Sequence, residues 1–94
     1  MPLGSFETYM PVPFAGSGPW GVAAGPDGAM WITELQGNAI GRITMDGRVA
    51  QFPIPTLGAN SFDIAAGPDG SMWFTEWNGN KIGRITMDGT VTEL

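Results

Sequence analysis

Short apolar runs, each ended by turn-forming residues, follow one another along the chain. The first run, residues 22–24, is small and apolar, and the second, residues 30–34, carries Trp, Ile and Thr, which favour strands. Residues 40–44 form the third run, and residues 49–52 form a fourth that alternates apolar and polar side chains. Gly-Pro-Asp-Gly, Gln-Gly-Asn and Asp-Gly separate the runs, and no segment between them is long enough for an ordinary helix. The pattern predicts four strands joined by hairpins.

The same pattern returns after 42 residues. Residues 25–28 and 67–70 are both Gly-Pro-Asp-Gly, and residues 40–47 are identical to residues 82–89. Roughly two-thirds of the aligned positions from Val22 onwards are identical. A period of this size is typical of a four-stranded propeller blade, and runs that change from small and apolar to polar match a blade's radial order. We therefore predict an all-β chain of two four-stranded antiparallel propeller blades.

The repeat also sets the boundaries of the units. Residues 6–13 lie one period before residues 48–55, so the chain opens with a spare fourth strand. We assign residues 1–13 to a spare outer strand and connector, 14–55 to blade 1 and 56–94 to blade 2. These are segments of one propeller and not independent domains. Such similar copies fit a recently duplicated, engineered or excised double blade, and equally the truncation of a longer chain.

Two blades are too few to close a propeller, which usually needs about four to eight. Both flanking faces of the pair are expected to be apolar and unpaired. We therefore expect a homo-oligomer, in which three copies give six blades or four copies give eight. The spare strand at residues 6–10 is expected to complete a neighbour's last sheet, in competition with residues 91–94.

Composition narrows the partners. The net charge is −5, and the four cations are scattered along the chain, so no basic patch for nucleic acid is expected. The chain contains no cysteine and therefore no disulfide framework or thiolate metal site. Its first residues lack the features of a signal peptide, and no apolar run is long enough to span a membrane. We expect no membrane partner and, by default, a cytoplasmic location.

Residues 67–93, Gly-Pro-Asp-Gly-Ser-Met-Trp-Phe-Thr-Glu through Ile-Gly-Arg-Ile-Thr-Met-Asp-Gly-Thr-Val-Thr-Glu, closely resemble a blade of the virginiamycin B (streptogramin) lyases. The resemblance covers nearly the whole chain and implies a family of seven-bladed propellers. Its enzymes linearise type B streptogramins by elimination at an ester linkage, with magnesium and a histidine as general base. This chain has no histidine, so no position can inherit that base, and we assign no catalytic residue.

Three functions follow from these observations. The first is a structural, self-assembling propeller module without catalysis of its own. The second is a binding module that holds a small molecule or an ion at the rim. The third is a streptogramin lyase, which requires that further blades of a longer chain supply the missing base.

One rim of each blade carries the loop between its second and third strands and the connector from the preceding blade, and the family's ligands bind on this side. The two copies differ there, as expected of variable loops on a rigid scaffold. Aromatic rings at these positions would stack on a ligand or, alternatively, pack between subunits. The candidate ligand-binding residues are Trp20, Leu35, Phe62, Asp63 and Trp77.

A second candidate set consists of carboxylates and amides that a symmetric assembly would arrange in a ring. Oxygen ligands of this kind suit magnesium or calcium, and the family resemblance also implies magnesium. The candidate metal ligands are Glu34, Glu76, Asn38 and Asn80. The alternative is that the two glutamates pair with Arg42 and Arg84 or cap loop amides.

Other repeated residues are expected to have structural roles. Trp31 and Trp73 are predicted to lie in the core between blades. Gly41 and Gly83, each inside a strand, predict close approach of a neighbouring blade or a β-bulge. The repeated aspartates are expected to be turn formers: Asp27, Asp46, Asp69 and Asp88.

Overall fold

The computed structural model describes residues 18–94, which form eight strands. Blade 1 contains β1 (Pro19–Ala24), β2 (Met30–Glu34), β3 (Ala39–Ile43) and β4 (Val49–Pro53). Blade 2 contains β5 (Ile64–Ala66), β6 (Met72–Glu76), β7 (Lys81–Ile85) and β8 (Val91–Glu93). The predicted spare strand at residues 6–10 lies outside the described residues.

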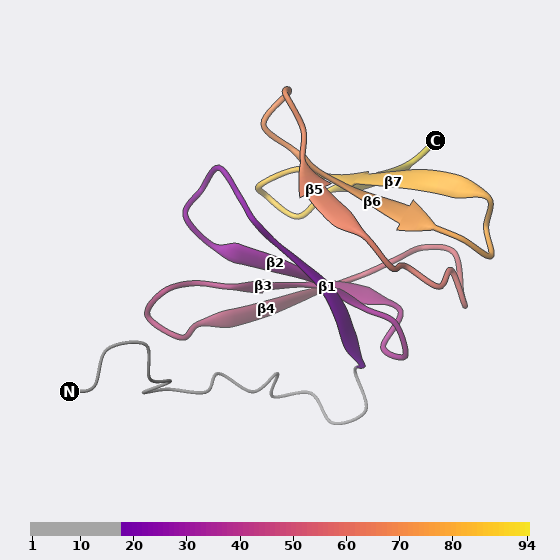
Figure 1. The fold of residues 1–94 in the computed structure, drawn as a ribbon, viewed down its shortest axis with the longest axis horizontal. Helices are drawn as coiled ribbons and strands as arrows, with labels where there is room; N and C mark the ends of the chain where they lie inside the picture. Colours follow the sequence, from indigo (N-terminus) through magenta and orange to yellow (C-terminus); the bar gives the residue numbers. More distant parts are fainter. Residues whose placement is uncertain (1–17) are drawn as a thin grey trace.

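Each blade is a four-stranded antiparallel sheet in sequence order, β1-β2-β3-β4 and β5-β6-β7-β8. The two sheets lie side by side, with β1 next to β5 (Figure 1). The predicted all-β, propeller-like fold is confirmed for residues 18–94. The part of the chain that the structure describes has no helix long and apolar enough to cross a membrane.

Equivalent turns in the two blades have nearly the same backbone. Gly28 and Gly70 have φ values of 82° and 81°, in the left-handed region that glycine tolerates. Asn38 and Asn80, in the loops between the second and third strands, both have a φ of 51°. Asparagine accepts this conformation more readily than most residues. The repeat in sequence is therefore also a repeat in conformation.

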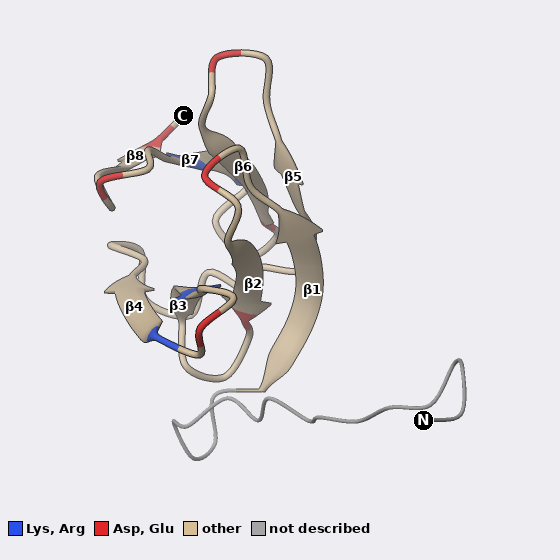
Figure 2. Ribbon diagram, turned by 90° about the vertical axis from the view of Figure 1, so that its left-hand side faces the viewer, with Lys and Arg blue, Asp and Glu red and all other residues tan. Residues whose placement is uncertain are grey.

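The hydrophobic core lies between the two sheets. Blade 1 contributes Trp31 and Ile40, which are fully buried, and blade 2 contributes Ile64, Phe74 and Ile85. The facing strands β1 and β5 carry no charged residue, and the acidic residues lie mainly in turns and near strand ends (Figure 2). The centre of the contact between blades is therefore apolar.

Gly41 and Gly83 were predicted to mark the close approach of a neighbouring blade or a β-bulge, and both explanations are wrong. The β2–β3 and β6–β7 registers run through both glycines without a bulge. A Cβ at Gly41 would lie 2.4 Å from Oε2 of Glu34, and one at Gly83 would lie 2.2 Å from the ring of Phe74. The close neighbours are side chains of the adjacent strand in the same sheet. Each glycine makes room for these side chains within its own blade.

Candidate functional site

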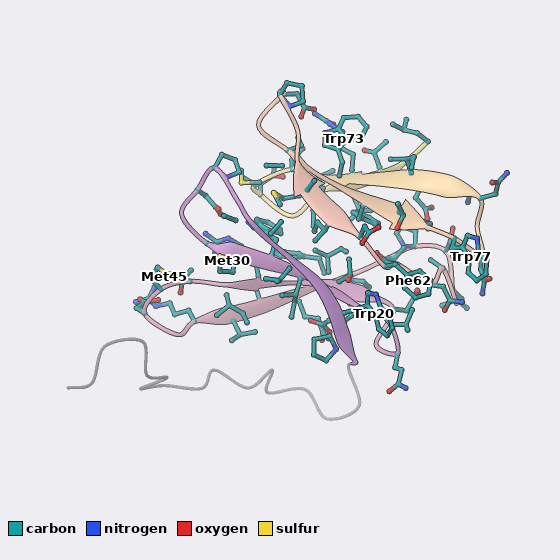
Figure 3. The ribbon with its side chains drawn as sticks, viewed as in Figure 1. Trp20, Met30, Met45, Phe62, Trp73 and Trp77 are labelled. Atoms are coloured by element: carbon teal, nitrogen blue, oxygen red, sulfur yellow. The ribbon has the colours of Figure 1, made fainter. Side chains whose placement is uncertain are left out.

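Three of the predicted rim residues form an aromatic cluster, although they come from distant parts of the sequence. Trp20 is the second residue of β1, Phe62 lies two residues before β5, and Trp77 follows β6 directly. The rings of Trp20 and Phe62 meet edge to face with centroids 5.4 Å apart, and those of Phe62 and Trp77 are 6.1 Å apart. Figure 3 shows the three side chains gathered on one side of the molecule. Trp20 and Trp77 are largely exposed, so their rings are accessible to a partner or ligand.

Leu35, the fourth apolar residue of the predicted rim set, has a different setting. It follows β2 directly, its side chain is half-buried, and its backbone N–H donates to the carbonyl of Gly18 at 2.9 Å. The equivalent bond in blade 2 runs from Trp77 to Asn60 at 3.2 Å. The two loops thus share this backbone hydrogen bond, and the change from Leu35 to Trp77 alters the side chain that the loop exposes.

An open cavity of about 630 Å³ lies at the rim end of blade 2. It includes three predicted residues, Phe62, Asp63 and Trp77, together with Glu76 and Asn80 of the predicted metal set. Sequence analysis missed four other lining residues, namely Thr75, Lys81, Ile82 and Leu94. The alternation of side chains along β6 and β7 was the available signal, because it places Thr75 and Ile82 on one face of the sheet.

A second cavity, of about 180 Å³, lies on the same face of blade 2. Asp63, Thr75 and Ile82 line both cavities, and Trp73 lines the smaller one. This face points away from blade 1. We call it the open face and define it by Trp73, Thr75, Ile82 and Leu94, which alternate with the inward side chains of their strands or strand ends.

In blade 1, the residues equivalent to the open face are packed against blade 2. Trp31 and Ile40 are 0% exposed, whereas Ile82 is 43% exposed and Trp73 is only half-buried. Leu94, one period after the half-buried Phe52, is 65% exposed. The prediction that Trp31 is core is confirmed, but Trp73 has no blade over it in the described part of this chain. Blade 2 therefore has the same packing surface as blade 1, but no other blade covers this surface in the described part of the chain.

The outward flank of blade 1 is equivalent to the inward face of blade 2. Val22 corresponds to Ile64, which is in the core, yet Val22 is 62% exposed. Ile32 and Ile43 belong to the same flank and are already buried. The outward flank is therefore most open at its innermost strand, β1.

A hydroxyl connects the two blades at the rim. Thr33 Oγ1 accepts a hydrogen bond from the backbone N–H of Gly21 at 2.8 Å and donates one to the carbonyl of Phe62 at 2.9 Å. In blade 2, Thr75 Oγ1 accepts from the N–H of Asp63 at 3.1 Å. The hydrogen bond within the blade is thus found in both blades. The hydrogen bond to another blade is made by Thr33.

The two predicted glutamates are buried in similar places but have different neighbours. Glu34 accepts a hydrogen bond from the amide of Gln51, which partly offsets the rise in pKa that burial causes. At the equivalent position, Glu76 faces Glu93. Burial and this second carboxylate raise the pKa of Glu76 to about 7, and Lys81 opposes the rise. Ionised Glu76 has no hydrogen-bond donor for either oxygen among the described residues.

The predicted metal set is divided in the structure. Asn38 uses its amide to donate to the carbonyls of Ile54 and Thr56 at 3.2 and 2.9 Å, and its oxygen accepts from the N–H of Ala59 at 3.1 Å. It holds the connector between blades. Residues 18–94 contain no group of three or more acidic, histidine or cysteine side chains that could hold a metal ion. These residues of one chain therefore do not fit magnesium, which stays a prediction for an assembled ring.

The alternative expectation, in which Glu34 and Glu76 pair with arginines, is wrong. Arg42 pairs with Asp27 and Arg84 with Asp69, both with Nε to Oδ2 distances of 2.7 Å. Asp27 also accepts from the indole N–H of Trp31 at 3.1 Å, and Arg42 lies over that ring. These aspartates are therefore more than turn formers, because each ties its turn to the second and third strands. Hydrogen bonds from Trp73 and Arg84 lower the pKa of Asp69.

Comparison with known proteins gives a consistent family match. The model of the virginiamycin B lyase family matches residues 2–94. The virginiamycin B lyase of Bordetella pertussis is 58% identical over 33 residues, which are 35% of this chain and 11% of that protein. The virginiamycin B lyase of Mycobacterium sp. (strain KMS) is 54% identical over 35 residues, or 37% of this chain and 12% of that one.

Solved structures of these enzymes superpose well. Selenomethionine-substituted virginiamycin B lyase from Staphylococcus aureus matches with a TM-score of 0.86 and 48% identity, covering 88% of this chain and 28% of that one. A catalytically inactive histidine-to-alanine variant of the S. aureus enzyme with quinupristin matches with a TM-score of 0.82 and 46% identity, covering 87% and 28%. This chain thus spans less than a third of the length of each of these solved proteins.

Proposed function

Because the chain belongs to the virginiamycin B lyase family, we propose that it serves as a two-blade building block that closes a propeller with further copies of itself. The observation that carries the proposal is the open face of blade 2. Its residues repeat those by which blade 1 packs on blade 2, yet Ile82 and Leu94 remain exposed. Fully burying a side chain of this kind contributes about 1.5–3 kcal/mol, so covering the face is strongly favoured.

A second copy is the partner best suited to this face. Within the chain, the surface that covers Trp31 and Ile40 is the inward face of blade 2, which includes Ile64. The outward flank of blade 1 is equivalent to that inward face, and Val22 is exposed on it. Among the described residues, the exposed parts of the open face and of the outward flank thus correspond to the two halves of one contact.

Such a contact is head to tail, because the surface given by one copy differs from the surface it receives. Head-to-tail contacts close into a ring when the rotation from copy to copy closes, and otherwise extend into a filament. Three copies would give six blades and four would give eight. The family's seven blades cannot be divided into pairs, so the ring of this chain differs from the family's in blade number.

We further propose that the assembly lacks lyase activity of its own. The chain has no histidine, and loss of one histidine accompanies catalytic inactivity in the S. aureus variant. Incubation with quinupristin, followed by chromatography, is expected to leave the compound unchanged. Conversion of quinupristin by the purified chain would contradict this part of the proposal.

The mass of the species in solution tests the ring directly. Sedimentation velocity is expected to give three or four copies for the wild type. Ile82→Asp is expected to shift the distribution to single chains, because it places a charge in the centre of the proposed contact. Leu57→Asp is the matched control, since Leu57 is 89% exposed in the connector between the blades and belongs to neither the open face nor the outward flank. A wild type that sediments as a single chain at all concentrations would rule out the ring.

The rim cavity supports a second candidate function, the binding of a small molecule. Its walls combine the aromatic rings of Phe62 and Trp77 with polar groups of Asp63 and Lys81, a combination common in ligand sites. Quinupristin is expected to change the tryptophan emission of the wild type and to have a smaller effect on Trp77→Leu, which copies Leu35 of blade 1. Unchanged wild-type emission at about millimolar ligand would exclude this function.

A further inference from the structure

The two blades of one chain approach each other very closely at Gly21 in β1. A Cβ at this position would lie 2.4 Å from the carbonyl oxygen of Phe62, a distance that real Cβ atoms do not reach. It would also lie 3.2 Å from Oγ1 of Thr33, which donates to the same carbonyl. The hydrogen bond between blades therefore depends on a residue without a side chain at position 21.

Blade 2 has a different residue at the equivalent position, Asp63. The local frame is the same, because the N–H of Asp63 donates to Thr75 as that of Gly21 donates to Thr33. If a contact between copies has the geometry of the contact within the chain, the carbonyl equivalent to that of Phe62 is the carbonyl of Trp20 in the next copy. The Cβ of Asp63 would then meet this oxygen at a forbidden distance.

We propose that Asp63 determines the geometry and strength of the contact between copies by holding β1 of the next copy away from blade 2. This inference rests on the proposed ring, and its occupant is a second copy of the chain. Because the strands cannot approach as closely, the Thr75 hydroxyl does not reach the Trp20 carbonyl of the next copy. The contact between copies lacks a hydrogen bond that the contact within the chain possesses.

We call the Cβ of Asp63 the wedge, because it holds the two strands apart. Its position affects the rim cavity locally. Asp63 lines both cavities of the open face, and its neighbour Phe62 is the centre of the aromatic cluster in Figure 3. A junction held apart at this point leaves space beside the first strand of blade 2, while Ile82, in β7, and Leu94, directly after β8, are covered. The ring would therefore alternate tight junctions within chains and looser junctions between chains.

A pair of substitutions at position 63 tests the wedge. Asp63→Gly removes the Cβ, and its assembly, followed by sedimentation over a dilution series, is expected to be at least about tenfold tighter, which matches one recovered hydrogen bond. Asp63→Ala keeps the Cβ and removes the charge, so it is expected to assemble as the wild type does. Equal tightening by both variants would assign the effect to charge and overturn the steric proposal.

The outcomes separate this inference from the proposed ring. If the wild type assembles and Asp63→Gly assembles no more tightly, the ring stands and the wedge is wrong. If the wild type stays a single chain while Asp63→Gly assembles, the wedge is supported and the ring of the natural chain is wrong. If neither assembles, both are wrong.

A measurement on the wild-type assembly tests the wedge without any substitution. The distance from Thr75 Oγ1 to the Trp20 carbonyl oxygen of the next copy is expected to exceed about 3.5 Å, the limit of a hydrogen bond. The corresponding distance within the chain, from Thr33 to Phe62, is 2.9 Å. A distance near that value between copies would overturn the inference.

Discussion

A single substitution between the repeats changes the chemistry of a buried carboxylate. In blade 1, Gln51 supplies an N–H to Glu34, so the charged form has a donor. In blade 2, Glu93 supplies a second negative charge instead, and the hydrogen bond from protonated Glu76 lowers the pKa of Glu93. The pair Glu76–Glu93 is therefore most stable with one proton, which takes the place of the amide proton in blade 1.

This pair predicts that stability falls as the pH rises. The pKa of Glu76 is about 7 in the folded chain, above the usual value of 4.5, so the folded state holds its proton more tightly. The stabilisation is complete below about pH 4.5 and is lost as the pH rises towards 7, by up to about 3 kcal/mol. Urea unfolding at pH 5 and pH 8 measures the difference.

Variants at the two equivalent positions identify its source. Glu93→Gln copies blade 1 and is expected to raise stability at pH 8 and to reduce the pH dependence between 5 and 8. Gln51→Glu is the reciprocal change and is expected to introduce a similar dependence in blade 1. A pH dependence that is unchanged in Glu93→Gln would show that the carboxylate pair is not its cause.

At the scale of the element, β1 depends on its glycine for the approach to β5. Gly21→Ala is expected to destabilise the chain by about 1–3 kcal/mol, because its Cβ would push Phe62 away and lengthen the hydrogen bond from Thr33. Denaturant unfolding measures the loss. Ala24→Gly, at an exposed position of the same strand, is the control for backbone flexibility, with an expected cost nearer 1 kcal/mol. Equal losses would show that the close approach is unimportant.

The strands themselves were predictable from sequence because strand residues and turn residues alternate so regularly. Residues 30–34 match β2 at both ends, and residues 40–44 are displaced from β3 by one residue at each end. The partners of side chains were less predictable. Arg42 and Asp27 are brought together by the pairing of β2 with β3, and spacing alone does not show which carboxylate an arginine reaches.

In the candidate site, too, some residues could be predicted from the sequence and others could not. Differences between the repeats identified Phe62, Asp63 and Trp77, which all line the rim cavity. They could not identify Ile82, which is identical to Ile40 in sequence and differs only because no blade covers it in the described part of the chain. The exposure of this residue follows from the number of blades in the chain, which is a property of the whole fold.

At the scale of the whole molecule, stability and assembly are expected to be linked. If copies cover the open face only in the folded state, dilution removes a stabilising contact, and the melting temperature falls. Thermal unfolding at about 1 and 100 µM should therefore give a higher melting temperature for the more concentrated sample. Ile82→Asp should melt at one temperature in both samples. A wild-type melting temperature independent of concentration would contradict the link.

The shared backbone of the two units has a consequence for how such a chain can change length. Apart from the change from Gly21 to Asp63, every unit gives the same kind of surface on one side and receives the same kind on the other. Inserting one more 42-residue unit would therefore create no new type of junction and would leave every existing turn intact. Insertions of other lengths inside a strand would shift its register, so this architecture can grow in evolution by whole units or by longer turns between strands.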